Sequence, residues 1–379
     1  MKILYVCWDY LEQYPPCQTQ LDLLTKSNHS VTLVYRSLVS DSAQVWFTKL
    51  HQNFRTPAFV EGAGKLSKIK TILDFRKVIN SLVKHEHYDL VWFGTEKSAL
   101  YSAKIVGNIP YIFNCLEYYE KGTTLSRLCG IAAKRAAVCT SCELTRAWLM
   151  KLDWQLSELP VVLPNKISKH PRKRYLSPTR SDTAAAINKM KGKRCILYQG
   201  WLTNDRSLEA VANALAELDC DIMLALMAPD NLDTQTSIRK LSAIYKRTIY
   251  LGYIPSPFHL EVTSHSFIGI ARYEGNIINN ILCAPNKIYE YAGFGIPILG
   301  NNVPGLQYSV GMRKAGLCVD FDNRKDLTNA LNELLTNSDM YKNGSEELFE
   351  GTDYEAAFQK VILCAANKVK QAQNQGDAA

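Results

Sequence analysis

The sequence has no long hydrophobic run. In 379 residues, no segment approaches the roughly 18 consecutive apolar residues that a membrane span requires. The first residues, Met1 to Cys7, form a short apolar run that ends at Trp8-Asp9, and no small-residue cleavage site follows them. We therefore expect a soluble protein whose first segment is a β-strand and not a signal peptide.

The glycine-rich loops of common nucleotide-binding folds are also missing. Residues 8–16, which follow the first predicted strand, contain no glycine, and the strand that begins at Cys195 is followed by Gly200 alone. A dinucleotide-binding domain needs Gly-x-Gly-x-x-Gly at such a turn, and a P-loop enzyme needs a Walker loop. The sequence therefore argues against NAD- or FAD-dependent oxidoreductases and against simple P-loop kinases and ATPases.

The sequence contains no convincing metal-binding pattern. Its 11 cysteines have no regular spacing, which indicates a reducing compartment such as the cytoplasm more than a disulfide framework. The pair Cys139 and Cys142 has the Cys-x-x-Cys spacing but no second pair and no nearby histidine, so zinc would lack ligands. Two buried thiols and a redox-active pair are the alternative interpretations. We expect no metal and no bound cofactor.

Short β-branched and aromatic runs alternate with helical patterns along the whole chain. This pattern is typical of parallel-sheet α/β domains, and the chain is too long for one ordinary core. We expect strands at residues 2–7, 30–35, 89–93, 110–115, 137–140 and 159–163, and again at 195–199, 221–227, 248–252, 267–271, 296–300 and 317–321. Between these two sets, prolines and basic residues interrupt the pattern.

The sequence thus predicts two doubly wound, Rossmann-like domains that face each other across a cleft. The expected divisions are an N-terminal domain at 1–165, a basic linker at 166–192, a C-terminal domain at 193–352, and a C-terminal helix and tail at 353–379. In such domains, ligands bind at the carboxyl ends of the strands.

The most informative segment is residues 284–299, which predicts a short helix between two strands. Pro285 precedes this helix, Asn286 can cap it, and a Gly-Phe-Gly turn ends it. The free N–H groups at the helix start and the charge of Lys287 together predict an anion site. Glu290 lies about 4.5 Å further along the helix axis, so one ligand could place a diphosphate on Lys287 and a ribose on Glu290. The alternative is that both side chains are solvated surface residues.

The run Pro-Asn-Lys-Ile-Tyr-Glu-Tyr, followed by Gly-Ile-Pro-Ile-Leu, resembles the donor-site motif of GT-B glycosyltransferases, especially glycosyltransferase family 4. In that family the glutamate that matches Glu290 binds the donor ribose. Residues 197–209 are similar to the family's phosphate loop, in which Arg206 takes the place of a basic residue six positions after Gly200. Trp201 stands where relatives often have a second basic residue.

Other stretches resemble the same family less strongly. Residues 251–255 look like the strand and loop that hold the nucleobase, which makes Tyr253 and Ile254 donor-site candidates. The strand at 110–115 resembles one that ends in His-Glu in relatives. Here Leu116 replaces the histidine, while Glu117 is kept as a candidate acceptor-side carboxylate, with a purely structural role as the alternative.

Many family members carry a further glutamate eight positions before the one that matches Glu290. Leu282 occupies that position here, so the carboxylate is absent. Glu274 or Asn280 could contact the donor instead, or the loop could consist of ordinary turn residues.

The resemblance implies a hexosyltransferase that moves a sugar from a nucleotide-diphosphate donor to a glycan or lipid-linked acceptor, in cell-surface polysaccharide biosynthesis. Retention of anomeric configuration and catalysis without a metal are implied in the same way, with Arg206 and Lys287 stabilising the departing diphosphate. A nucleotide-sugar epimerase and a catalytically inactive nucleotide-sugar-binding module are the alternatives. Trp201, Leu116 and Leu282 favour the inactive module.

Basic residues indicate where the chain could meet a charged partner. The formal net charge is +8, but Arg172-Lys173-Arg174 has no interleaved aromatics, so we expect no nucleic-acid binding. Residues 65–84 form an amphipathic, lysine-rich pattern that either packs on the first domain or meets an anionic membrane. We therefore expect a cytoplasmic protein, with peripheral attachment to the inner face of the membrane as the second option.

Overall fold

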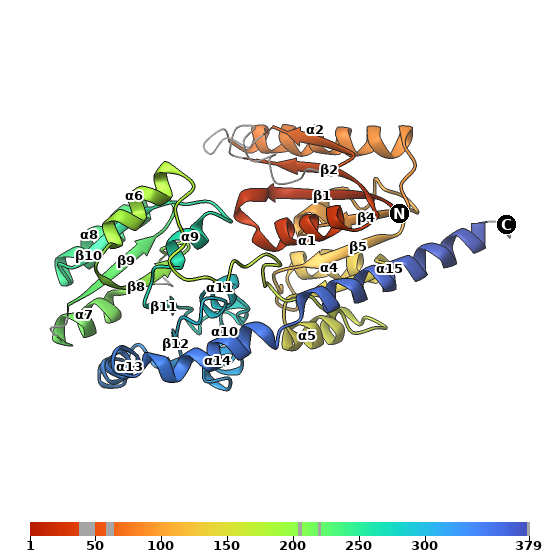
Figure 1. Ribbon diagram of the computed structural model, residues 1–379. Helices are drawn as coiled ribbons and strands as arrows, with labels where there is room; N and C mark the ends of the chain where they lie inside the picture. Colours follow the sequence, from red (N-terminus) through yellow and green to blue (C-terminus); the bar gives the residue numbers. More distant parts are fainter. Residues whose placement is uncertain (38–49, 58–63, 204–206, 219–220, 377–379) are drawn as a thin grey trace. The chain divides into compact units, whose positions relative to one another are not determined.

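The computed structural model describes residues 1–376 except 38–49, 58–63, 204–206 and 219–220 (Figure 1). The chain divides into two compact units. The first unit comprises Met1–Ser168 together with Asp353–Ala379, and the second comprises Lys169–Thr352. Each unit is built around one parallel sheet.

The first unit has a seven-stranded sheet in the order β3-β2-β1-β4-β5-β6-β7. Its strands are β1 (Lys2–Tyr10), β2 (Ser30–Arg36), β3 (Gln52–Thr56), β4 (Leu90–Phe93), β5 (Tyr111–Cys115), β6 (Val138–Ser141) and β7 (Val161–Val162). The order reverses between β1 and β4, which is the switch point of a doubly wound domain. Sequence patterning missed β3, because this edge strand is polar apart from Phe54.

Helices cover both faces of the first sheet. They are α1 (Pro15–Lys26), α2 (Gly64–His85), α3 (Glu96–Ser102), α4 (Thr124–Arg135), α5 (Leu144–Trp154) and α15 (Tyr354–Gly376), with a 3-10 turn, η1 (Leu11–Gln13). On one face Trp92 stacks on Phe358 of α15, with ring centroids 5.5 Å apart. On the other face Trp8 meets Phe75 of α2 edge-on at 5.1 Å. The C-terminal helix therefore completes the core of the first unit (Figure 1).

The second unit has a six-stranded sheet in the order β10-β9-β8-β11-β12-β13. Its strands are β8 (Arg194–Gln199), β9 (Ile222–Met227), β10 (Thr248–Gly252), β11 (Ile268–Ala271), β12 (Ile298–Asn301) and β13 (Gly316–Val319). Its helices are α6 (Ser181–Met190), α7 (Glu209–Leu218), α8 (Leu232–Ile244), α9 (His259–Thr263), α10 (Ile278–Ile281), α11 (Asn286–Ala292), α12 (Pro304–Leu306), α13 (Arg324–Thr336) and α14 (Ser338–Glu350), with a π-helical turn, η4 (Gln307–Gly311).

Helix α11 is fixed to this sheet by Tyr291. A Cβ on Gly269 of β11 would lie 2.3 Å from the Tyr291 ring, so only glycine lets the ring pack this closely. The Tyr291 hydroxyl also donates to the Leu197 carbonyl of β8 at 3.0 Å. These contacts set the position of the side chains on α11.

The basic segment 166–192 is not the separate linker that the sequence predicted. From Lys169 onward it belongs to the second unit. The Arg174 guanidinium donates to the Ser264 carbonyl at 2.8 Å, and the Thr179 N–H donates to Glu261 Oε2 at 2.9 Å. Residues of this segment that the sequence suggested were solvent-exposed therefore hold it to the second unit by hydrogen bonds. None of the helices in the described ranges combines the length and apolarity of a bilayer-spanning segment.

Candidate functional site

The carboxyl edge of the second sheet carries most of the predicted site residues. Parallel strands end at the same edge, so loops far apart in sequence deliver their side chains to one region. These residues are Gly200 after β8, Tyr253 and Ile254 after β10, Glu274 after β11, Asn280 on α10, and Asn286, Lys287 and Glu290 on α11. Arg206 lies outside the described residues.

Lys287 is buried and directed toward the end of β8. Its Nζ lies 4.4 Å from the centroid of the Tyr198 ring and 5.5 Å from that of Tyr273. A Cβ on Gly200 would be 3.3 Å from this Nζ, and Gly200 has φ of +119°, which side-chain-bearing residues rarely adopt. The positive charge of Lys287 and the backbone of the loop after β8 therefore lie side by side.

Glu290 is also buried, with 4% of its surface exposed, so it is not the solvated surface residue that the sequence left as the alternative. Its Oε1 lies 3.1 Å from Nε2 of His259, and its Oε2 accepts a hydrogen bond from the Gln199 side-chain amide. Burial raises the pKa of Glu290, but the charge and hydrogen bond of His259, followed by the charge of Lys287, outweigh it and lower the pKa overall. Glu290 is therefore an ionised carboxylate in a polar network.

Neighbouring side chains hold this network in place. The Thr263 hydroxyl donates to Gln199 Oε1 at 2.7 Å, which turns the Gln199 amide nitrogen toward Glu290. His170 Nε2 lies 3.0 Å from the Glu290 carbonyl oxygen, while its Nδ1 accepts the Arg172 N–H at 3.0 Å. Burial lowers the pKa of His170 to about 4, so the ring is neutral near pH 7 and carries its proton on Nε2.

Sequence reasoning missed these supporting groups. Gln199, Thr263 and His170 come from three separate parts of the second unit, and no short motif links them to α11. Gln199 gave the best available signal, because it ends a predicted strand directly before Gly200.

The remaining candidates occupy the rim of the same edge. Tyr253 is exposed, whereas Ile254 is buried. Asn276 connects the other two, because its Nδ2 donates to Glu274 Oε2 at 3.4 Å and its Oδ1 accepts from Asn280 Nδ2 at 3.2 Å. Sequence analysis predicted these two as alternatives, and the structure brings both into one loop network.

Asn286 does not cap α11 as the sequence predicted. The capping position is Pro285, with φ −75° and ψ 142°, and Asn286 is the first helical residue. Because the proline side chain has no hydrogen-bond acceptor, no side-chain hydrogen bond caps this helix start.

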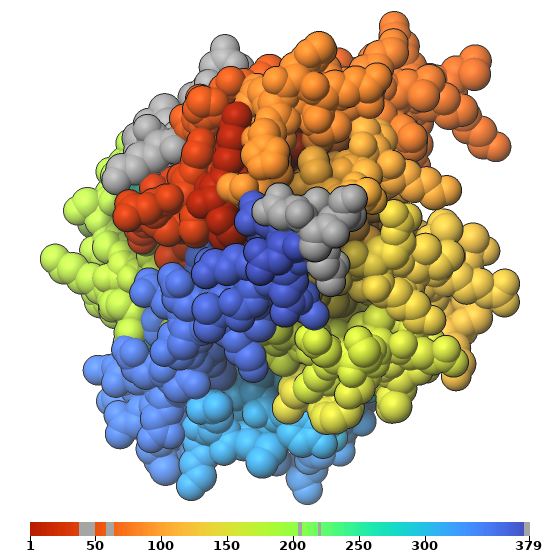
Figure 2. Space-filling model, turned by 90° about the vertical axis from the view of Figure 1, so that its right-hand side faces the viewer, coloured from red at the N-terminus to blue at the C-terminus, as the bar shows by residue number. Residues whose placement is uncertain are grey.

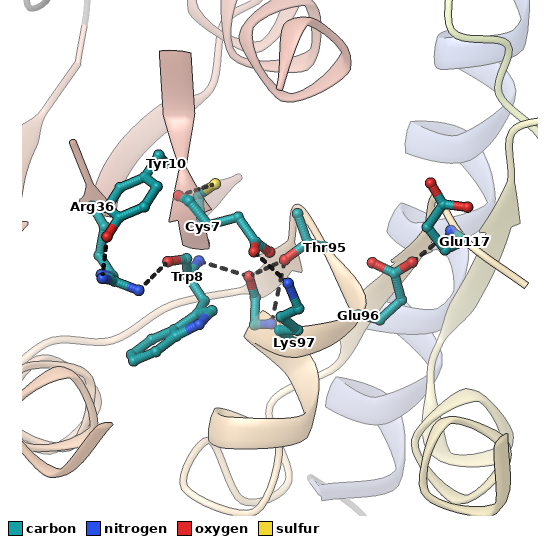
Figure 3. Close-up of polar contacts among 10 residues, drawn as sticks. Cys7, Trp8, Tyr10, Arg36, Thr95, Glu96, Lys97 and Glu117 are labelled. Atoms are coloured by element: carbon teal, nitrogen blue, oxygen red, sulfur yellow. Dashed lines mark hydrogen bonds and ion pairs between the residues drawn. The ribbon is translucent and has the colours of Figure 1, made fainter. Parts of the chain in front are cut away.

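The carboxyl edge of the first sheet carries a second group of polar residues (Figure 3). Glu117, after β5, has an exposed side chain whose Oε2 lies 3.6 Å from Nη1 of buried Arg146. Its backbone N–H donates to Oε1 of Glu96, the first residue of α3, at 2.5 Å. Burial, followed by the charge of Glu117, raises the pKa of Glu96 to about 8. Glu96 was missed, although its place three residues after the end of a predicted strand was a signal.

The same edge also carries cations. Lys97 Nζ lies 2.9 Å from Asp9 Oδ1, and Arg36 stacks between the rings of Trp8 and Tyr10 (Figure 3). No group of His, Cys, Asp and Glu side chains among the described residues is arranged to hold a metal ion.

Neither a family model nor a curated protein sequence matches the chain. Solved structures do match it over nearly its whole length. HepE from Anabaena, in complex with UDP and glucose, is 14% identical with a TM-score of 0.72, covering 97% of this chain and 99% of that chain. The chain shares the fold of GT-B glycosyltransferases.

Two further structures show the same likeness. A glycosyltransferase from Rickettsia africae is 11% identical with a TM-score of 0.69, covering 98% of both chains. The UDP-GlcNAc 2-epimerase from Neisseria meningitidis, bound to UDP-GlcNAc, is 11% identical with a TM-score of 0.63, covering 97% of this chain and 100% of that chain. These matches confirm the predicted pair of Rossmann-like domains.

Proposed function

We propose that the chain is a glycosyltransferase that binds a nucleotide-sugar donor at the carboxyl edge of its second sheet. The observation that carries this proposal is the arrangement of Gly200, Lys287 and Glu290. The Lys287 ammonium group lies beside the Gly200 backbone, and its charge acts on the ionised Glu290 carboxylate of the same helix. The complex of HepE with UDP and glucose supports it, since that protein has the same fold.

In this proposal Lys287 and Arg206 bind the donor diphosphate. Sugar transfer leaves negative charge on the diphosphate, and a cation fixed in advance stabilises that charge as it develops. Lys287 is suited to this because aromatic rings already hold its ammonium group away from bulk water. No metal is required for this step, and we expect the anomeric configuration to be retained.

Glu290 is proposed to accept hydrogen bonds from the donor ribose. His259 and Gln199 contact one oxygen each, and a carboxylate oxygen can accept a second hydrogen bond. These two residues would then hold the carboxylate in one orientation. Tyr253 and the backbone at Ile254 are proposed to contact the base, and Glu274, Asn280 and Asn286 the phosphate and sugar.

Glu117 of the first unit is proposed to bind the acceptor and to assist removal of its hydroxyl proton. Its side chain is exposed, as an acceptor contact requires, and Glu96 holds its backbone. The acceptor is proposed to be a glycan or lipid-linked saccharide of cell-surface polysaccharide synthesis, on the cytoplasmic side of the membrane.

A thermal-shift screen with UDP, GDP, ADP, CMP and dTDP, together with their sugars, tests the proposal. A ligand that binds only the folded state stabilises it, by about 2.7 kcal/mol at a hundredfold excess over Kd. We expect one diphosphate to raise the melting temperature and its sugar to be consumed only when an acceptor is added. No shift with any nucleotide would contradict the proposal.

An epimerase is the second candidate, because two UDP-GlcNAc 2-epimerase structures share the fold. The neighbouring carboxyl groups of Glu96 and Glu117 are the group type that proton transfer at a sugar carbon needs. Incubation with UDP-GlcNAc alone distinguishes the two activities, since only an epimerase forms the 2-epimer without an acceptor.

A further inference from the structure

Helices α4 and α5 expose large apolar side chains in two rows. On α4 the spacing is three residues and on α5 it is four, so each row lies along one side of its helix. The exposed fractions run from 37% for Leu125 to 67% for Leu152. We call this surface the α4–α5 face; its apolar residues are Leu125, Leu128, Ile131, Leu144, Trp148 and Leu152.

Helix α4 has an inverted distribution of side chains. Its buried positions are small, namely Ser126, Cys129, Gly130, Ala132 and Ala133, while its leucines and isoleucine are exposed. An ordinary surface helix turns its large apolar side chains to the core. Exposed apolar patches of this kind mark interaction surfaces.

The two helices are packed as one unit. Gly130 of α4 lies against Trp154 of α5, where a Cβ would be 3.1 Å from the indole ring. The Trp154 Nε1–H also donates to the Ser126 hydroxyl at 3.0 Å. The packing of α4 against α5 therefore fixes the positions of the two apolar rows relative to each other.

Basic residues surround this face. Helix α4 has no acidic residue, and within the described ranges none of Arg127, Lys134 and Arg135 forms an ion pair with a carboxylate. On α5, Lys151 Nζ lies 5.6 Å from the Trp148 ring. In Figure 2 this part of the chain, coloured yellow, contributes to the molecular surface that faces the viewer.

Two of the carboxylates near these helices are engaged, whereas Glu120, four residues before α4, is exposed. Glu143 accepts the Arg146 N–H at 2.9 Å at the start of α5. Asp153 accepts from the Tyr118 hydroxyl and lies 3.8 Å from Lys121 Nζ. The face therefore offers apolar side chains within a positive border, which complements an anionic, apolar partner.

We propose that the α4–α5 face docks the protein onto an anionic lipid bilayer. Trp148, the leucines and Ile131 enter the boundary between headgroups and acyl chains, while the basic side chains meet lipid phosphates. The proposal deepens the proposed function by naming the surface from which a lipid-linked acceptor would be taken. For residues 65–84 the sequence left packing on the first domain and contact with an anionic membrane as alternatives, and this inference names a different surface.

Co-sedimentation with vesicles tests this inference. We expect the intact protein to bind vesicles of phosphatidylcholine mixed with phosphatidylglycerol, to bind phosphatidylcholine alone much more weakly, and to be released by salt. Replacing Lys134 and Arg135 by glutamine should weaken binding about fivefold for each charge removed. The triple change Leu128→Ser, Ile131→Ser and Trp148→Ser should abolish binding.

Leu232→Ser is the matched control, because Leu232 is 78% exposed on α8 of the second unit. It should bind vesicles as the unchanged protein does, and all variants should keep their affinity for UDP in solution. Vesicle binding without any nucleotide binding would overturn the proposed function but not this inference.

The inference is overturned if the unchanged protein fails to bind anionic vesicles or if the triple variant binds them normally. It is also overturned if the triple variant changes only the elution volume in gel filtration, since the face would then join two copies of the chain.

Discussion

Glu290 is buried and contacts His259 and Gln199, and these neighbours determine what removal of its charge should do. Glu290→Gln removes the charge that meets His259 and places an amide opposite Gln199. We expect a loss of about 1.5 to 3 kcal/mol in the free energy of unfolding, and a fall in UDP affinity of about ten- to a hundredfold. Urea unfolding and calorimetric titration measure the two effects.

The pKa of Glu290 is lowered, so its contribution to stability is present above its ordinary value of 4.5 and disappears as the pH falls through the folded-state value. The stability difference between Glu290→Gln and the unchanged protein should therefore shrink in acid. Glu347→Gln on α14 is an exposed control. A stable Glu290→Gln that binds UDP normally would remove Glu290 from the site.

Glu96 should produce the opposite pH dependence. Its pKa is raised from 4.5 to about 8, so between these values the folded state keeps a proton that the unfolded chain loses. Stability should therefore fall as the pH rises through this window, and Glu96→Gln should remove that fall. At about pH 9 we expect the variant to be more stable than the unchanged protein by on the order of 3 kcal/mol, and at about pH 4 the two should be alike.

Urea unfolding across the pH range measures this difference, with exposed Glu120→Gln as the control. Equal pH profiles for Glu96→Gln and the unchanged protein would show that Glu96 is ionised in the folded state at neutral pH.

Local chemistry in the sequence marked some residues of the candidate site. Gly200 and Lys287 both lie beside a strand end or helix start, and the structure brings them together. Glu96 and His259 were missed, because their importance comes from partners distant in the chain. Burial of Glu290 depends on α9 packing beside α11, which no local pattern predicts.

At the level of elements, every predicted strand is present in the structure, with ends that differ by at most three residues. The alternation of apolar runs and helical patterns is local, so single stretches reveal it. Local patterns do not predict where the C-terminal helix packs, because α15 follows the second unit in sequence but packs on the first unit. Its apolar face predicts that one side of the helix is buried, but it does not predict which of the two sheets the helix covers.

A core substitution on α15 tests this assignment. Phe358 is buried against Trp92, so Phe358→Ala should lower the free energy of unfolding by about 3 to 5 kcal/mol. Leu363, on the same helix, is 62% exposed, and Leu363→Ala should cost far less. Urea unfolding followed by tryptophan fluorescence measures both, and equal losses would mean that α15 does not complete the first core.

At the level of the whole molecule, the two sheets share one topology, and their functional edges have different chemistry. The second edge combines Lys287 with a buried carboxylate, to which the proposed function assigns the donor diphosphate and ribose. The first edge presents the exposed Glu117 beside the protonated Glu96, and the proposed function assigns the acceptor hydroxyl to Glu117. The fold was predictable from strand and helix periodicity, whereas this division of chemistry needed the three-dimensional neighbours of each residue.

Calorimetric titration of UDP into Gly200→Ala tests the central claim most directly. The change strains a backbone with φ of +119° and places a methyl group 3.3 Å from Lys287 Nζ. Gly192→Ala is the matched control, because Gly192 has φ of +71° and no atom within 4 Å of the added carbon.

Both variants should lose about 1 to 3 kcal/mol of stability. Only Gly200→Ala should lose UDP affinity, because the methyl group disturbs the contact between Lys287 and the diphosphate. The loss should be about tenfold or more, which corresponds to one charge-assisted hydrogen bond, while the affinity for uridine stays unchanged. If the unchanged protein binds no nucleoside diphosphate, or Gly200→Ala binds UDP as tightly as Gly192→Ala, the donor site does not lie between Gly200 and Lys287.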